Sequence, residues 1–271
     1  MSNQERLQNK VAIITGSSRG VGAAIARLLA QNNYHVVINY SKSEKEALAV
    51  GAACEASGAE TLLCRANVAE DADCRRMVHE TMTRWGRIDA LVNNAGTTKF
   101  CAHDDLEGLA KEDFLNIYNV NLVGPYQMIR AVAPHMKKIG KGAVVNIAST
   151  AGINGNGSCV AYCASKGALI TMTKSLARAL GPEIRINAVC PGFIQGEWLQ
   201  GGMGRENYDA LKNYLEATNP LRTTATPETI APTVLFFLRD ATLVTGETLV
   251  LDCGTHLGAK ISVSSHNAAK D

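Results

Sequence analysis

Short apolar runs rich in β-branched residues alternate with longer segments of helical periodicity along most of the chain. Runs such as Val11–Thr15 are apolar up to their last residue, which is typical of strands buried on both faces of a parallel sheet. The segments between them place apolar side chains on one helical face. The predicted strands are Val11–Thr15, Tyr34–Tyr40, Glu60–Arg65, Ala90–Asn93, Ala143–Ala148, Ile184–Val189 and Thr248–Leu251; the predicted helices are Val21–Gln31, Ser43–Ser57, Glu70–Trp85, Leu122–Lys138, Val160–Leu180 and Pro227–Leu238.

This alternation predicts an α/β fold with a doubly wound parallel sheet and helices on both faces. No Pro/Gly/Ser-rich linker divides the sequence, so we expect one domain over residues 1–271. A polar helical segment with glycine-rich ends, at about 195–222, interrupts the alternation after the sixth predicted strand. The polar tail at about 259–271 is predicted to fray.

Composition narrows the class of protein. The 271 residues are 46% hydrophobic and 19% charged, which is typical of a globular protein, and the net charge of +2 gives no electrostatic case for nucleic acid or an acidic membrane surface. We expect no signal peptide and no membrane span, because neither the polar first ten residues nor any later run is apolar enough; a cytoplasmic location follows as an expectation. The eight cysteines form no C-x-x-C pair, and the six histidines show no metal-ligand spacing. Reduced thiols and no metal site are therefore predicted.

A glycine-rich turn joins the first predicted strand to the first predicted helix. Glycine lets the backbone turn tightly and approach a pyrophosphate, and free N–H groups at a helix N-terminus favour an anion. Because the G-x-x-x-G-x-G spacing departs from the usual G-x-G-x-x-G, an ordinary strand–helix turn is the alternative. The turn reads Thr15-Gly16-Ser17-Ser18-Arg19-Gly20-Val21-Gly22, and we expect Gly16, Ser18, Arg19, Gly20, Val21 and Gly22 to bind a dinucleotide.

The end of the second predicted strand carries no acidic residue. Enzymes that use NAD usually place Asp or Glu there to hold the ribose 2′-hydroxyl. A 2′-phosphate needs cations and hydroxyl donors instead, and a carboxylate would repel it. The segment reads Asn39-Tyr40-Ser41-Lys42, so Tyr40, Ser41 and Lys42, together with Arg19, favour NADP(H) over NAD(H); a solvated surface lysine is the alternative for Lys42.

Tyr162 and Lys166 lie four residues apart in a predicted helix, so they project from one face. An ammonium near a phenol lowers the pKa of the phenol from about 10. The phenol can then exchange a proton with a substrate oxygen while a hydride moves at carbon. The alternative is that Tyr162 and Lys166 are simply a surface pair at i,i+4 spacing on the helix. Ser149 follows the fifth predicted strand, at the edge where doubly wound sheets bind ligands, and its hydroxyl could donate to a carbonyl or cap a turn.

Together these residues resemble the short-chain dehydrogenase/reductase family, and within it the 3-oxoacyl-acyl-carrier-protein reductases. The resemblance extends from residue 11 to about 258 and implies a Rossmann fold and an oxidoreductase that acts on a ketone or secondary alcohol. The matching residues are Thr15-Gly16-x-x-x-Gly20-x-Gly22, Asn93-Asn94-Ala95-Gly96, Asn121, Ser149, Tyr162-x-x-x-Lys166 and Pro191-Gly192.

The resemblance also implies roles. Tyr162 would be the general acid in reduction, Lys166 would lower its pKa and hold the nicotinamide ribose, and Ser149 would orient the substrate carbonyl. Asn121 would anchor a water in a proton relay. Along the cofactor, Asn94, Ala95 and Gly96 would line the adenosine ribose side, and the nicotinamide would be lined by Val189, Pro191, Gly192, Phe193 and Ile194. A purely structural role is the alternative for both groups, since Asn-Asn-Ala-Gly also makes a strand-end turn.

The chain departs from the family pattern at three places. The family commonly has Asp-Val beside the adenine, and this chain has Asn67-Val68 there. We expect Asn67 and Val68 to bind the adenine with little loss of binding. Gly196 stands where the family often has a threonine, so a side-chain hydroxyl contact to the nicotinamide carboxamide is in doubt. Cys253 replaces a glycine in a segment that typically lies in a subunit interface.

The segment 195–222 resembles the substrate lid of the family. Trp198, Leu199, Met203 and Tyr214 are candidates for substrate contact, with simple packing as the alternative. The family implies a homotetramer assembled through helices near residues 112–138 and 160–180 and the last strand. The substrate is expected to be a small carbonyl or alcohol, or an acyl-carrier-protein-linked one. A non-catalytic NADP(H)-binding sensor or scaffold is the second class of function, although such proteins usually lack one of Tyr, Lys or Ser.

Overall fold

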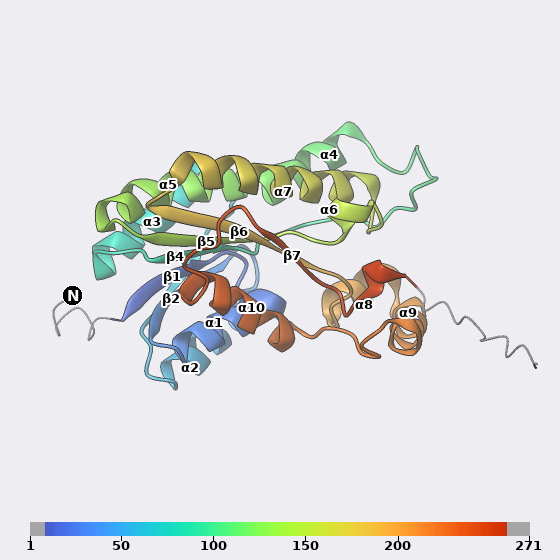
Figure 1. The fold of residues 1–271 in the computed structure, drawn as a ribbon, viewed down its shortest axis with the longest axis horizontal. Helices are drawn as coiled ribbons and strands as arrows, with labels where there is room; N and C mark the ends of the chain where they lie inside the picture. The colour runs from blue at the N-terminus through green and yellow to red at the C-terminus, as the bar shows by residue number, and fades with distance from the viewer. Residues whose placement is uncertain (1–8, 259–271) are drawn as a thin grey trace, which may run out of the picture.

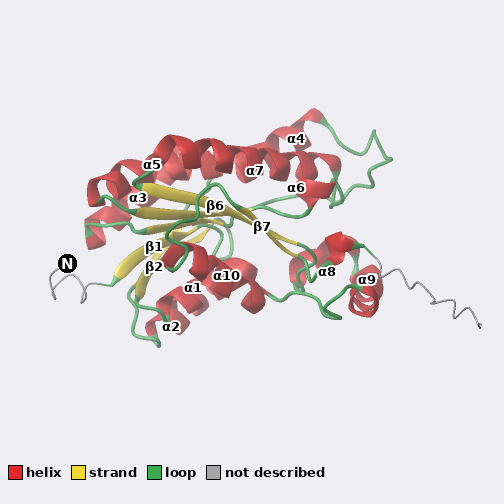
Figure 2. Cartoon of the chain, viewed as in Figure 1, coloured by secondary structure: helices red, strands yellow, loops and turns green. Residues whose placement is uncertain are grey.

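The computed structural model describes residues 9–258, where seven parallel strands form one sheet with helices on both faces (Figures 1 and 2). The strand order β3-β2-β1-β4-β5-β6-β7 reverses between β1 and β4. The predicted doubly wound α/β fold is therefore confirmed. The strands are β1 (Lys10–Ile14), β2 (Tyr34–Tyr40), β3 (Thr61–Arg65), β4 (Ala90–Asn93), β5 (Gly142–Ile147), β6 (Ile184–Pro191) and β7 (Thr248–Leu251).

Helices α1, α2 and α10 cover one face of the sheet, and α3, α5 and α7 cover the other (Figure 1). The helices that cover the sheet are α1 (Gly20–Ala30), α2 (Glu44–Glu55), α3 (Asp71–Trp85), α5 (Gly124–Ile139), α7 (Val160–Leu180) and α10 (Pro227–Arg239). The continuous apolar strands follow from this arrangement. In β1, Ile14 packs into the cluster beneath α1, and Ile13 packs into the cluster beneath α3 and α5.

Several elements were not predicted. The helix α4 (Lys111–Tyr118) precedes α5, and the π-helix η1 (Asn119–Val123) joins the two. The short helix α6 (Ala151–Asn154) follows β5, and a 3₁₀ turn, η2 (Thr255–Leu257), follows β7. Within 195–222 the chain forms α8 (Glu197–Met203) and α9 (Arg205–Thr218), separated by Gly204 at φ +79°. These two helices lie at the end of the sheet where the carboxyl ends of the strands meet (Figure 2).

The predicted tail at 259–271 lies outside the described residues. Between residues 9 and 258, no helix combines the length and the apolar character that crossing a bilayer requires.

Candidate active site

The glycine turn after β1 packs closely against the segment that follows β4. Gly16 has φ +62°, and a Cβ placed on it would lie 2.9 Å from the Ala95 Cα. A Cβ on Gly22 would lie 2.5 Å from both the Gly16 carbonyl oxygen and the Asn94 Nδ2. Arg19, the N-cap of α1, makes no side-chain capping hydrogen bond, so no side chain there occupies the first N–H groups of the helix. These features fit a dinucleotide pyrophosphate, which needs close backbone approach and free donors.

Polar side chains fix this turn to its neighbours. The Asn94 amide donates to the Thr15 and Gly16 carbonyls, at 3.0 Å each, and the Thr15 hydroxyl accepts from the Asn94 and Ala95 backbone N–H groups. Asn39, at the end of β2, accepts from the Gly16 N–H and donates to the Ala66 carbonyl. Asn39 was not singled out from the sequence, because an amide that bridges three strand ends has no sequence pattern.

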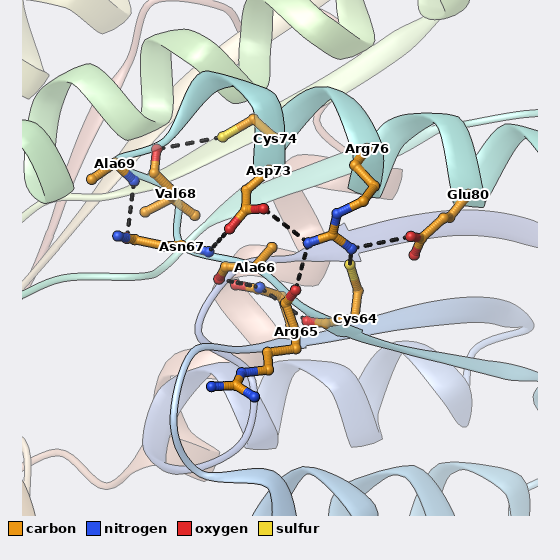
Figure 3. Close-up of polar contacts among 11 residues, drawn as sticks. Cys64, Arg65, Ala66, Asn67, Val68, Ala69, Asp73, Cys74, Arg76 and Glu80 are labelled. Carbon is orange, nitrogen blue, oxygen red and sulfur yellow. Dashed lines mark hydrogen bonds and ion pairs between the residues drawn. The ribbon is translucent and has the colours of Figure 1, made fainter.

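A polar pocket of about 390 Å³ opens beside the end of β2, and it is lined by Ser41, Arg65, Ala66, Asn67, Asp73 and Arg76. Arg76 is held in place, since it donates to the Arg65 carbonyl at 2.7 Å and pairs with Asp73 and Glu80 (Figure 3). The Arg65 guanidinium instead points away from this network (Figure 3). Arg65 is opposite Tyr40 in the sheet register and was missed by the sequence analysis.

Asn67 and Val68 form the turn between β3 and α3. The Asn67 N–H donates to Asp73, and the Asn67 side-chain oxygen accepts from the Ala69 N–H at 3.2 Å. Val68 is buried, and its carbonyl accepts from the Gln127 amide at 2.8 Å. The Asn67 side-chain oxygen therefore stabilises its own turn, and the residue is exposed where it lines the pocket.

Tyr162 and Lys166 lie near each other on α7, at the carboxyl end of β5. The Lys166 ammonium is 5.7 Å from the Tyr162 ring centroid and donates to the Ile147 carbonyl at 2.7 Å. A Cβ on Gly96 would lie 3.8 Å from the Lys166 Nζ. The Asn94-Ala95-Gly96 segment thus connects the glycine turn to the side chains on α7.

The pKa of Tyr162 moves in the direction opposite to the one predicted. Tyr162 keeps part of its surface exposed, but burial of its phenol raises the pKa to about 12, and a hydrogen bond with the Ser149 hydroxyl opposes that rise. Burial also lowers the pKa of Lys166 to about 8. The predicted fall in the Tyr162 pKa was wrong because both groups are desolvated, and desolvation favours the neutral form of each.

Ser149 caps a turn, one of the two roles that the sequence left open, and it also contacts the phenol. Its hydroxyl oxygen accepts from the Ala151 N–H at 3.1 Å, at the start of α6, and it also forms the hydrogen bond with Tyr162. A turn-capping serine can therefore face the phenol as well.

Asn121 lies in the π-helix and is fully buried. Its amide oxygen accepts from the Thr97 N–H at 2.8 Å, and its amino group donates to the Thr97 carbonyl and the Ser165 hydroxyl at 3.0 Å. A Cβ on Gly96 would lie 3.5 Å from the Asn121 Oδ1. Asn121 therefore ties the segment after β4 to α7, and π-helical turns occur frequently at such functional sites.

The end of β6 is held close to β7. The Gly192 N–H donates to the Leu251 carbonyl at 2.9 Å, and a Cβ on Gly192 would lie 2.6 Å from the Asp252 Cβ. Ile194 forms a bridge with Ala225. Gly196 has φ +149°, a conformation that disfavours the threonine common in the family. Buried Val189 and Pro191 precede this segment, and Cys253 follows Asp252 at φ +59°.

The segment 195–222, named the lid below, covers the same end of the sheet. The Trp198 and Tyr162 ring centroids are 6.1 Å apart with an interplanar angle of 78°, an edge-to-face contact. Tyr214 is 63% exposed, and Leu199 and Met203 are partly buried. Of these four candidates, Trp198 is the one whose ring contacts Tyr162.

All eight cysteines are free, and six of them are buried. Over residues 9–258 no group of three His, Cys, Asp or Glu side chains is arranged to hold a metal ion.

Comparison with known proteins agrees with this geometry. A family model described as enoyl-(acyl carrier protein) reductase matches residues 16–256. The candidate ketoacyl reductase 2 of the granaticin polyketide synthase from Streptomyces violaceoruber is 39% identical over 91% of this chain and 96% of its own length. The 3-oxoacyl-acyl-carrier-protein reductase FabG of Staphylococcus epidermidis is 36% identical over 92% of this chain and its full length.

Solved structures agree as well. A crystal structure of a candidate short-chain dehydrogenase/reductase from Burkholderia xenovorans is 38% identical, with a TM-score of 0.86 over 95% of this chain and all of that one. NAD⁺-bound xylitol dehydrogenase is 26% identical, with a TM-score of 0.83 over 92% of this chain and all of that one. The chain therefore belongs to the short-chain dehydrogenase/reductase family, and within it is most like the 3-oxoacyl-acyl-carrier-protein reductases.

Proposed function

We propose that this protein is an NADP(H)-dependent oxidoreductase that transfers a hydride between the nicotinamide and a ketone or secondary alcohol. The observation that carries the proposal is the convergence of Tyr162, Lys166 and Ser149 beside Gly96, at the sheet edge that also holds the glycine turn. Ligands of doubly wound sheets bind at this edge, where the strand order reverses.

The residues that would hold the cofactor extend along this edge. Gly16, Gly20 and Gly22, with Ser18, Arg19 and Val21, would surround the pyrophosphate; Asn94, Ala95 and Gly96 would line the ribose; Pro191, Gly192 and Ile194 would line the nicotinamide. Asn67 and Val68 would face the adenine. When bound there, the nicotinamide supplies or accepts the hydride.

The preference for NADP(H) rests on Ser41 and Lys42 after β2, Arg19 at the start of α1 and Arg65 at the end of β3. Arg19, Ser41 and Lys42 are exposed. Arg65 lines the same pocket as Ser41, and its guanidinium is turned away from the Arg76 network (Figure 3). The Tyr40 hydroxyl donates a hydrogen bond to the Glu44 carboxylate at 3.1 Å, which stabilises the turn between β2 and α2. Cations and a hydroxyl are suited to a 2′-phosphate, which guanidinium groups bind through charge-assisted hydrogen bonds.

In reduction, Ser149 would donate to the substrate carbonyl and Tyr162 would deliver the proton to the developing alkoxide. The raised pKa of Tyr162 suits this direction, since the phenol is protonated at neutral pH. Lys166 would hold the nicotinamide ribose hydroxyls, and its charged form would stabilise the phenolate left after proton transfer. Asn121, through its bonds to Thr97 and Ser165, would position the water that returns a proton to Lys166.

The test is turnover of a panel of ketones, β-ketoesters and alcohols, followed by the absorbance of the reduced nicotinamide. Tyr162→Phe should remove most turnover and keep NADPH binding, because the substitution deletes only the phenol oxygen. Unchanged cellular function of this variant, with no carbonyl reduced by the wild type, would favour the sensor or scaffold instead.

The oligomeric state and the domain organisation of the protein are also proposed. A shallow apolar groove of about 600 Å³ crosses α5 and α7, lined by side chains that include Tyr126 and Met172. A homotetramer formed through these helices would cover it. We also propose one domain over residues 1–271 and a cytoplasmic location.

A further inference from the structure

The lid places an indole directly against the proposed proton donor. Trp198, in the first turn of α8, contacts the Tyr162 ring edge-to-face and is still 54% exposed. A substrate carbonyl that reaches Tyr162 and Ser149 therefore has the Trp198 ring beside one of its two substituents. That substituent meets an aromatic surface rather than a charged or hydrogen-bonding one.

The lid is seated on the segment that follows β4. Gly202 lies so close to the Phe100 ring that a Cβ on Gly202 would come within 1.8 Å of it. The Tyr208 hydroxyl accepts from the Gly196 N–H at 3.2 Å, and the Tyr208 ring packs 5.2 Å from Phe193. The position of α8 is thus fixed at its beginning and near its end, which holds Trp198 over the site.

Carboxylates without ion-pair partners lie on two segments beside Tyr162 and Trp198, since His103 bonds the Gly157 carbonyl and Gly157 adjoins the Tyr162 ring. The exposed residues Asp104, Asp105 and Glu107 occupy the loop before α4, and exposed Glu197 begins α8. None of the four takes part in an ion pair within residues 9–258. Of the cations on the same segments, Lys99 pairs with Asp113, Arg205 with Asp209 and Lys212 with Glu216, whereas exposed Lys111 and Arg222 have no ion pair among residues 9–258. The four unpaired carboxylates outnumber these two cations, so the face carries net negative charge. An acidic carrier protein approaching this face would meet repulsion, since like charges disfavour association.

We propose that the substrate is a free, uncharged ketone or secondary alcohol whose bulky apolar group packs against Trp198, and that carrier-linked acyl chains are disfavoured. This inference rests on the proposed function and narrows its substrate class. The indole selects for the apolar group, and the carboxylates of the loop 104–107 and Glu197 disfavour the acidic carrier.

The first test compares cyclohexyl methyl ketone with acetoacetyl-acyl-carrier-protein, using the full chain and NADPH. We expect kcat/KM to be at least tenfold higher for the free ketone. Raising the ionic strength should increase kcat/KM for the carrier-linked substrate, because salt screens repulsion between like charges. A higher kcat/KM for the carrier-linked substrate, falling as salt is added, would overturn the proposal.

The second test uses Trp198→Ala. The kcat/KM for cyclohexyl methyl ketone should fall about tenfold, while that for 2-butanone should change less than threefold, because a pocket discriminates by the apolar surface it can cover. Trp198→Phe should restore most of the loss. Leu211→Ala, on the same lid in α9 and 37% exposed, is the matched control and should alter neither value.

An equal fall for both ketones in Trp198→Ala would contradict the selective role of the indole. The failure of the broader function is distinguishable from this outcome, because it would appear as no oxidation of NADPH with any carbonyl, free or carrier-linked.

Discussion

Replacing Arg65 with leucine should reduce the catalytic efficiency with NADPH and leave that with NADH unchanged. A hydrogen bond to a charged partner contributes about 1.5–3 kcal/mol. Arg65 is exposed and would share the phosphate with Arg19 and Lys42, so solvent screening reduces the expected contribution to about 1 kcal/mol. That loss corresponds to a roughly fivefold fall in kcat/KM for NADPH.

The assay is kcat/KM for each cofactor at fixed carbonyl concentration and low salt. Arg76→Leu is the informative comparison, because Arg76 supports the Arg65 carbonyl and pairs with Asp73 and Glu80. It should lower the melting temperature and weaken both cofactors together. Equal effects of Arg65→Leu on NADPH and NADH, or no effect on either, would refute the assignment of Arg65 to the 2′-phosphate.

Three further expectations follow from the site and the core. The rate of alcohol oxidation should rise about tenfold per pH unit between pH 6 and 8, because oxidation needs the deprotonated phenol and burial raises the pKa of Tyr162 to about 12. The rate of carbonyl reduction should stay nearly constant over the same range. An oxidation rate that levels off below pH 7 would contradict this. Asn146→Ala should lower the free energy of unfolding by about 2–4 kcal/mol in urea, because Asn146 links buried Asn93 and Thr173 at 2.8 and 2.9 Å, while exposed Asn156→Ala should not. Gly22→Ala should raise the NADPH dissociation constant more than tenfold by calorimetry, because its Cβ would displace the glycine turn; an unchanged constant would argue against binding there.

The features that depend on local residue patterns could be predicted from the sequence. The apolar runs located all seven strands; in the central strand β1 the neighbouring residues Ile13 and Ile14 face opposite clusters, so both must be apolar. The glycine spacing and the Tyr162–Lys166 spacing located the candidate site, because the geometry of a turn or a helix follows directly from spacing.

Features that depend on distant contacts could not be predicted. Arg65 belongs to the candidate cofactor pocket because β3 pairs with β2, and neither its neighbours in sequence nor its residue type indicates this. The contact between Trp198 and Tyr162 depends on how α8 is seated on Phe100. The pKa of Tyr162 depends on burial, which spacing along a helix does not encode.

The π-helix at Asn119–Val123 has a consequence for how this stretch tolerates changes in length. A π-turn inserts the equivalent of one additional residue into an otherwise α-helical path, and each α-helical residue turns the chain by about 100°. Deleting a single residue here would allow α4 and α5 to merge into one regular helix without rotating either, because the π-turn holds the additional residue outside the α-helical register. The widened turn that carries Asn121 would be lost with its hydrogen bonds to Thr97, so a one-residue deletion could keep the fold and still separate the two halves of the site.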